Sequence, residues 1–206
     1  MSERFAPNGY VLGVDLGTTA GWCIMAPDGT IIECGVWGHA PATETKKRVG
    51  EPDGARYTKF RDNLIALLDR QAAAGRTVTH IAFEIVHRHP GGVKAAHAYG
   101  GYKAILTSVA FERCIPCDEV EVSAVKIAAT GKGRAEKEDV VDAAAKRWPQ
   151  LADRLCPTAD TINDDLGDAL WITEIRRLEL TGDRATWQPK RPRKPPSPRS
   201  RPSRRP

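Results

Sequence analysis

Hydrophobic residues in the first forty positions come in three short runs separated by turn-forming residues. The runs cover residues 10–15, 21–25 and 30–37, and the segments between them contain Gly17 and Pro27-Asp28-Gly29. Short apolar runs bounded by glycine, proline and aspartate are typical of β-strands joined by tight turns. The pattern therefore predicts three consecutive strands at the start of the chain.

Helical and strand-like periods follow. Apolar positions recur at helical spacing from Tyr57 to about Ala74, and residues 78–86 are almost continuously apolar, as in a strand covered on both faces. The other expected elements are helices at about 90–113, 135–148 and 163–180, a strand near 119–122 and a polar loop over 39–54. This order predicts an α/β fold in which a mixed five-stranded sheet carries helices on both faces.

The end of the chain has a different composition. From residue 189 onward, seven of eighteen residues are proline, and most of the others are Arg, Lys or Ser. Such a segment cannot build a core and is expected to be disordered. The full chain has 206 residues and 41% hydrophobic content, and the part before this segment is long enough to form one domain with a hydrophobic core. We therefore expect a domain over 8–182 and a disordered basic tail over 186–206.

Charge is distributed unevenly between these two parts. The formal net charge is +5, but residues 186–206 hold eight Lys or Arg and no acid, which leaves residues 1–185 with a net charge of −3. A basic arm on a mildly acidic body suggests a polyanionic partner.

Cysteine usage and hydropathy indicate a cellular compartment. The five cysteines are an odd number, and Cys114-Ile115-Pro116-Cys117 lacks a second Cys or His pair of matching spacing that would complete a zinc site. Reduced thiols of a cytoplasmic protein are the better interpretation. No apolar run approaches the ~20 residues of a membrane span, and residues 1–5 do not resemble a secretory signal.

Four acidic residues stand in apolar surroundings. Asp15 ends the first apolar run, Glu84 interrupts the run 78–86, and Asp165 and Asp168 project from one face of the last predicted helix. A carboxylate in a buried strand is unfavourable unless its charge is compensated, and hard oxygen ligands suit Mg²⁺ or Mn²⁺. These residues are therefore the predicted metal ligands of a phosphodiester-cleaving site.

Each acid also has a purely structural interpretation. Asp15 could cap a hairpin turn, and Glu84 could reach solvent from a strand end. Acids near Asp164 could favour the dipole of the helix that starts there. This last interpretation fits Asp168 less well, because Asp168 lies further into the helix and apolar residues follow it.

The segment 13–21 combines a strand, an acid and a turn rich in Gly and Thr. Its glycines could allow close approach to a phosphate or a positive φ, and Thr18 and Thr19 could donate hydroxyls to an oxyanion. The segment also resembles the first phosphate loop of actin- and sugar-kinase-like ATPases. Those proteins need a second hairpin of the same type, which this chain lacks.

Taken together, the four acids resemble the acidic tetrad of RuvC-type Holliday-junction resolvases, members of the ribonuclease H-like superfamily. Residues 125–137 resemble the family's Val-Lys, Gly-x-Gly, Ala-x-Lys segment, and residues 91–101 are similar to a stretch found in phage-encoded relatives. The resemblance extends over about residues 10–180 and implies a ribonuclease H-like fold. Asp165, rather than its neighbour Asp164, keeps the family's three-residue step to Asp168.

The resemblance also implies a mechanism. Asp15 would bridge two Mg²⁺ ions about 4 Å apart, for which Mn²⁺ would substitute. Glu84 would bind on one side and Asp165 with Asp168 on the other, and cleavage would leave a 5′-phosphate. Among the nearby basic residues, Lys137, as a catalytic residue, and Lys126 are the candidates for contacting or polarising the scissile phosphate.

Basic residues near these acids are expected to bind DNA. Lys126, Lys132 and Arg134 surround a Gly-x-Gly turn at a helix start, a suitable place for phosphate. Solvent-exposed residues on a polar face are the alternative, which competes most strongly for Lys132 and Arg134.

The expected function is Mg²⁺-dependent cleavage of four-way junctions or other branched DNA. A homodimer is implied because a junction offers two-fold-related strands. The location would be the cytoplasm, that of the host if the protein is phage-encoded. Alternatives are cleavage of RNA–DNA hybrids, an actin-like ATPase and a DNA-binding protein without catalysis. A proofreading-type exonuclease is disfavoured, because its first strand carries Asp-x-Glu and position 17 here is Gly.

Overall fold

The computed structural model describes residues 9–39, 53–87, 92–158 and 161–182. At its centre lies a five-stranded sheet with the order β3-β2-β1-β4-β5. The strands are β1 (Tyr10–Val14), β2 (Thr19–Met25), β3 (Ile31–Gly38), β4 (Val78–Ile85) and β5 (Cys117–Glu121). The first three pair antiparallel, whereas β4 runs parallel to both β1 and β5. The prediction of a mixed five-stranded sheet is confirmed.

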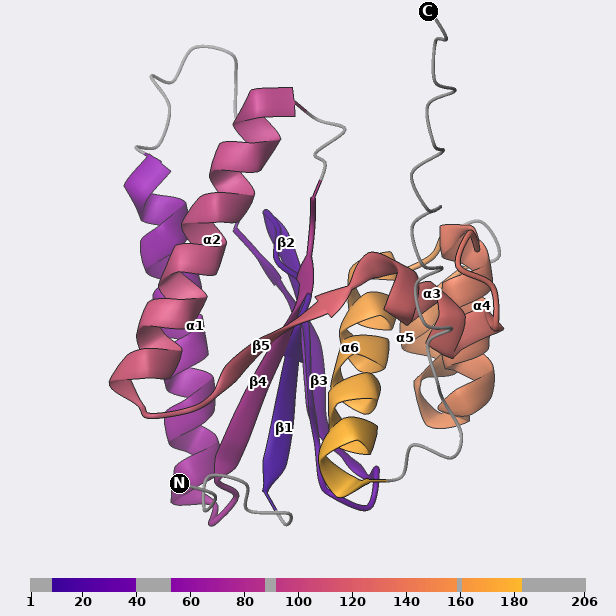
Figure 1. The fold of residues 1–206 in the computed structure, drawn as a ribbon, viewed down its shortest axis with the longest axis horizontal. Coiled ribbons are helices and arrows are strands. Elements are labelled where there is room, and N and C mark those ends of the chain that lie inside the picture. Colours follow the sequence, from indigo (N-terminus) through magenta and orange to yellow (C-terminus); the bar gives the residue numbers. More distant parts are fainter. Residues whose placement is uncertain (1–8, 40–52, 88–91, 159–160, 183–206) are drawn as a thin grey trace, which may run out of the picture.

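Helices cover both faces of this sheet (Figure 1). One face carries α1 (Asp53–Ala73) and α2 (Gly92–Glu112). The other carries α3 (Val122–Thr130), α4 (Lys137–Arg147), the short α5 (Ala152–Leu155) and α6 (Asp164–Thr181). A single 3₁₀ turn, Pro149–Leu151, joins α4 to α5.

Two helices, α3 and the short α5, were not predicted from the sequence. Residues 122–130 form α3, although they were expected to contain the end of a strand and a connection. Val125 of α3 is buried in the core, and Gly131, with a φ of 75°, ends the helix. A helix of nine residues, all but Lys126 small or β-branched, has too few turns for its period to be distinctive, so packing determines its structure.

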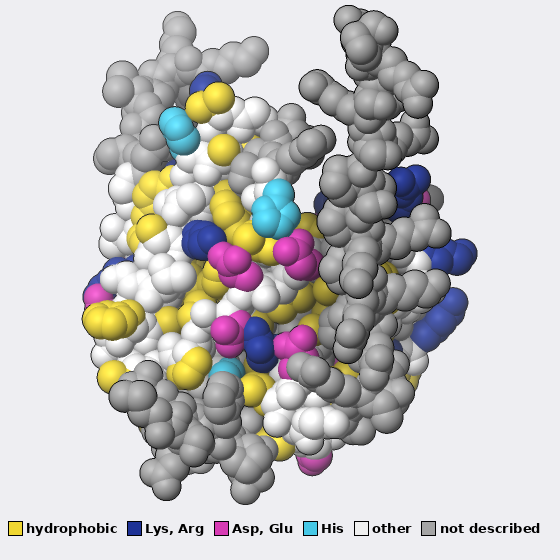
Figure 2. All heavy atoms as spheres, in the orientation of Figure 1, with side chains coloured by type: hydrophobic (Ala, Val, Ile, Leu, Met, Phe, Trp, Pro, Cys, Tyr) yellow, Lys and Arg dark blue, Asp and Glu magenta, His cyan; other side chains and the backbone are white. Residues whose placement is uncertain are grey.

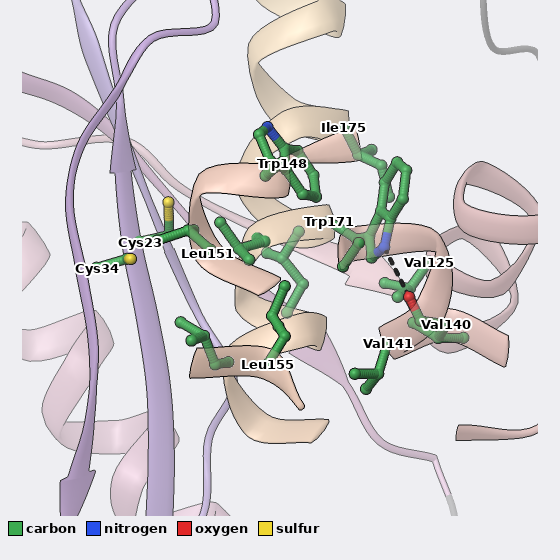
Figure 3. Close-up of a cluster of buried hydrophobic side chains, with 14 of the residues drawn as sticks. Cys23, Cys34, Val125, Val140, Val141, Trp148, Leu151, Leu155, Trp171 and Ile175 are labelled. Atoms are coloured by element: carbon green, nitrogen blue, oxygen red, sulfur yellow. Dashed lines mark hydrogen bonds between the residues drawn. The ribbon is translucent and has the colours of Figure 1, made fainter. Parts of the chain in front are cut away.

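The hydrophobic core has two parts, one on each side of the sheet. In the part under α3 to α6, the indole Nε1 of Trp171 donates a hydrogen bond to the Val140 carbonyl at 3.3 Å, and Trp148 packs against Trp171 (Figure 3). Helix α6 is therefore held between the sheet and α4, which explains why most of its side chains are buried.

Strand β5 forms one edge of the sheet and carries acidic side chains with basic partners. Acidic and basic groups stand side by side on this face of the molecule (Figure 2). The pairs on the strand are Asp118 with Arg176, Glu119 with Lys103 and Glu121 with His87. Charged side chains protect an edge strand from pairing with another chain, so β5 is less prone to bind the edge of a second sheet.

Two predictions lie mainly outside the described residues. They are the polar loop over 39–54, of which the model describes 39 and 53–54, and the basic tail over 186–206. The predicted domain boundaries, 8 and 182, also remain predictions. Among the described residues, no helix is both long and apolar enough to cross a bilayer.

Candidate active site

Two of the four predicted acids lie on neighbouring parallel strands. Val14 is in register with Phe83, so the next residues, Asp15 and Glu84, come at the same end of the sheet. The Asp15 amide donates to the Gly21 carbonyl at 2.9 Å, which continues the pairing of β1 with β2 to this residue. Parallel strands thus bring two carboxylates together from positions 69 residues apart in the sequence.

The other two acids come from the first turns of α6. The Asn163 side chain caps this helix by accepting a hydrogen bond from the Leu166 amide at 3.1 Å. Asp165 and Asp168 are partly buried, as are Asp15 and Glu84. Both helical acids affect the ionisation of Asp15, which places them near the strand ends. The predicted tetrad is therefore assembled from β1, β4 and α6.

Electrostatics show how unfavourable this assembly is without a compensating charge. Burial raises the pKa of Asp15 well above its ordinary value, and the charges of Asp168, Glu84 and Asp165 raise it further. Burial and the charge of Asp168 raise the pKa of Glu84 to about 7. Burial is also the main reason that the pKa values of Asp165 and Asp168 rise to about 6. At neutral pH the site has an excess of negative charge.

A divalent cation fits this donor chemistry. All four side chains present carboxylate oxygens, the ligand type that Mg²⁺ prefers. In the part of the chain that the structure describes, however, no three His, Cys, Asp or Glu side chains are already gathered closely enough to hold one metal ion. The carboxylates are near enough to affect one another's pKa, but they do not form a closed coordination shell.

Two lysines lie beside the acids. Lys137, at the start of α4, forms a salt bridge with Asp164, and the positive charge of Lys137 lowers the pKa of Asp165 and of Asp168. Lys126 of α3 donates to the Ala135 carbonyl at 2.7 Å. Charges of both lysines also lower the pKa of Glu84.

Comparison with known proteins identifies the fold. No family model and no curated protein matches the sequence. Among solved structures, RuvC of T. thermophilus in complex with a Holliday junction substrate is similar with a TM-score of 0.61 and 20% identity. That match covers 85% of this chain and 96% of the other. The chain has the RuvC fold.

A second neighbour supports the same fold. The yeast mitochondrial Holliday junction resolvase Ydc2 aligns over 87% of this chain and 82% of its own, with a TM-score of 0.57 and 15% identity. Together these matches confirm the prediction of a RuvC-type, ribonuclease H-like α/β fold.

Within the RuvC fold, the glycines of the segment 13–21 have a different purpose from the one predicted. None of Gly13, Gly17 and Gly21 has a positive φ. A Cβ on Gly13 would lie 2.2 Å from Thr173 Oγ1, and one on Gly21 would lie 1.8 Å from the Asp165 carbonyl oxygen. Two of these glycines therefore let α6 approach the sheet and bring its acids to the strand ends.

The remaining predicted residues lie on the turn between α3 and α4. Lys132 and Arg134 are exposed, and their charges are not among those that shift the pKa of the four acids. The Thr130 hydroxyl accepts from the Lys132 amide at 3.2 Å and so shapes this turn. Both side chains face solvent beside the site rather than inside it.

Sequence reasoning missed one neighbour of the site. Tyr99 of α2 contacts the backbone at Glu84 and Val86 through its hydroxyl. The resemblance at residues 91–101 includes Tyr99 but gave no sign of this contact, because the contact joins a helix to a strand end across the fold.

Proposed function

We propose that this protein is a Mg²⁺-dependent endonuclease that cleaves four-way or otherwise branched DNA. The observation that carries the proposal is the convergence of Asp15, Glu84, Asp165 and Asp168 at one end of a RuvC-fold sheet. A protein that only bound polyanions would be hindered by such a cluster of negative charge. One structural neighbour is a RuvC bound to a Holliday junction, and another is itself a Holliday junction resolvase.

The four carboxylates would hold the cations. Asp15 and Glu84 would supply ligands for two Mg²⁺ ions from the strand ends, and Asp165 and Asp168 would supply ligands from α6. Bound Mg²⁺ lowers the pKa of water and stabilises the charge that develops on a phosphate during hydrolysis. The ions would also relieve the repulsion that raises the pKa values of the four carboxylates.

Basic residues next to the acids would orient the DNA backbone. Lys137 is well exposed, and we propose that its ammonium group contacts the scissile phosphate. Lys126 is partly buried and would stabilise negative charge near Glu84. Lys132 and Arg134, exposed on the neighbouring turn, would contact phosphates further along the strand.

A homodimer would match the two-fold symmetry of a four-way junction, with one site for each of two strands. The outward face of α2 is a suitable place for the second copy. Val93 is 71% exposed and Phe111 is 85% exposed, although both side chains are apolar.

Cleavage of defined substrates tests the proposal. Labelled four-way junction, linear duplex and RNA–DNA hybrid would be incubated with the protein in Mg²⁺ or in EDTA. We expect paired nicks in the junction, dependent on Mg²⁺ and lost in Asp15→Asn. Asp62→Asn, which changes an exposed aspartate of α1, is the matched control and should cleave normally. Preferential cleavage of the hybrid would indicate a ribonuclease instead, and no cleavage of any substrate would overturn the proposal.

A further inference from the structure

The end of β4 is held by a side chain from α2. The Tyr99 hydroxyl donates a hydrogen bond to the Glu84 carbonyl at 2.8 Å and accepts one from the Val86 amide at 3.4 Å. A tyrosine hydroxyl has one proton to donate and lone pairs to accept, and here both functions are used on the same stretch of backbone. One side chain thus spans the residues on either side of Ile85.

This contact occurs where the sheet itself gives Glu84 less support. The regular pairing of β4 with β1 ends at Phe83, one residue before Glu84. On the opposite side, pairing with β5 continues only to Ile85. A carboxylate at a strand end is free to move with its backbone unless another element restrains it.

Tyr99 is well placed to provide that restraint. Its ring packs against the hydrophobic cluster between the sheet and α1 and α2, so the hydroxyl reaches the strand end from an anchored position. Glu84 and Asp168 are close enough for the charge of Asp168 to act on the Glu84 carboxyl group, although α6, which carries Asp168, lies on the other face of the sheet.

We propose that Tyr99 is a positioning residue, which fixes the backbone of Glu84 so that its carboxylate meets the metal ion together with the acids of α6. The inference rests on the proposed nuclease function. Groups that orient metal ligands from outside the coordination shell typically change metal affinity or activity 10- to 100-fold when removed.

The chain offers two matched controls. The Tyr57 hydroxyl of α1 donates a hydrogen bond to the His97 carbonyl of α2 at 3.5 Å. This contact also joins an aromatic side chain to a backbone oxygen. Among the residues that the structure describes, the hydroxyl of the buried Tyr102 has no hydrogen-bond partner. Phenylalanine at position 99, 57 or 102 removes one oxygen in each case and leaves the ring.

The experiment compares Tyr99→Phe, Tyr57→Phe and Tyr102→Phe with the wild-type protein. Calorimetric titration with Mn²⁺ measures metal affinity, single-turnover cleavage of a four-way junction measures rate, and hydrogen exchange measures protection of residues 84–86. For Tyr99→Phe we expect about tenfold weaker Mn²⁺ binding and about tenfold slower cleavage, partly restored by excess metal. The KM for the junction should remain within a factor of about two, and exchange at residues 84–86 should be faster.

Two outcomes would overturn the inference. Tyr99→Phe could match the two controls in metal affinity and rate, or it could raise KM while leaving Mn²⁺ affinity unchanged. Failure of the proposed function has a different signature, since the wild-type protein would then neither bind Mn²⁺ nor cleave DNA. In that case faster exchange in Tyr99→Phe alone would still establish the restraint on the strand end, without a role in metal binding.

Discussion

Gly21 of β2 faces the backbone carbonyl of Asp165 so closely that a Cβ built on this glycine would lie 1.8 Å from the carbonyl oxygen. The obstacle would be helix backbone, which cannot rotate away as a flexible side chain can. The distance between the sheet and the first turn of α6 is therefore set by the absence of a side chain at position 21, and the placement of Asp165 depends on it.

Alanine at this position should displace the helix. We expect Gly21→Ala to lower the free energy of unfolding by roughly 1–3 kcal/mol, as is usual for overpacking, and to slow junction cleavage at least tenfold. Gly38→Ala is the control, since Gly38 also lies in a strand and a Cβ there would have no described residue within 4 Å. Thermal unfolding and single-turnover cleavage measure the two effects, and equal cleavage by both variants would contradict the argument.

Burial of the acids, together with their mutual repulsion, should make the metal-free protein less stable as pH rises. The pKa of Asp168 is about 6 in the folded state, above the ordinary value of 3.8, so the folded protein binds this proton more tightly than the unfolded chain. The folded protein is therefore stabilised by the protonated Asp168 carboxyl; this stabilisation is fully present below about pH 4 and is lost as pH rises through 6. In EDTA at pH 8, Asp168→Asn should therefore raise Tm by roughly 2–6 °C relative to the wild type.

At pH 4 the same substitution should leave Tm nearly unchanged, because the wild-type carboxyl is then protonated. Addition of Mg²⁺ at pH 8 should raise the Tm of the wild type more than that of Asp168→Asn. Asp62→Asn, on the exposed surface of α1, should behave as the wild type in all three conditions. A gain in Tm that is the same at pH 4 and pH 8 would show that Asp168 is not under electrostatic strain.

The adjacent acids of α6 should differ in importance. Asp164 is engaged by Lys137, whereas Asp165 has its pKa raised to about 6 by burial and by the charge of Asp164. We expect Asp165→Asn to reduce cleavage at least 100-fold and Asp164→Asn to reduce it less than tenfold. Single-turnover rates at saturating Mg²⁺ distinguish the two, and the reverse order would assign the metal ligand to Asp164.

A buried ion network away from the acids should affect stability without taking part in chemistry. Glu174 of α6 bonds Arg147 of α4 at 2.9 Å and Arg177 at 2.7 Å, and Arg177 also donates to the Pro27 carbonyl. Removal of one partner leaves a buried charge uncompensated, so Glu174→Ala should lower the free energy of unfolding by about 3–5 kcal/mol. The exposed Glu138→Ala on α4 is the control in denaturant unfolding. A loss as small as that of the control would show that the network is dispensable.

The tail should contribute to DNA affinity in a salt-dependent way. Residues 186–206 carry eight basic residues and no acid. Deletion of this segment should weaken DNA binding at low salt and reduce the slope of log affinity against log salt concentration by several units, because fewer counterions are released. The cleavage rate at saturating DNA should be unaffected. An unchanged slope would mean that the tail does not contact the DNA backbone.

Sequence periodicity predicted the strands and the long helices because each has enough residues for its pattern to be distinctive. It also placed Asp15 and Glu84 correctly, since parallel strands align their ends. Helix α3 was missed because its nine residues, all but Lys126 small or β-branched, carry little periodic signal. The role of the glycines could not be predicted, because a turn and a helix-packing surface require the same residue.

Tyr99 illustrates a second limit on what sequence can reveal. Its partners on the backbone at Glu84 and Val86 are 15 and 13 residues away, and backbone groups have no identity that a sequence pattern could mark. Contacts from a side chain to another segment's main chain depend on the exact depth at which a helix packs. Only the folded structure provides that depth.

The acids come from β1, β4 and α6, and so from the first and the last elements of the described fold. A ribosome must therefore release nearly the whole domain before the set is complete. Until α6 emerges and docks against Gly13 and Gly21, the growing chain has two carboxylates at the sheet and none opposite them. The proposed nuclease would thus be synthesised without its complete set of acids, and would acquire the set only once α6 has left the ribosome and docked.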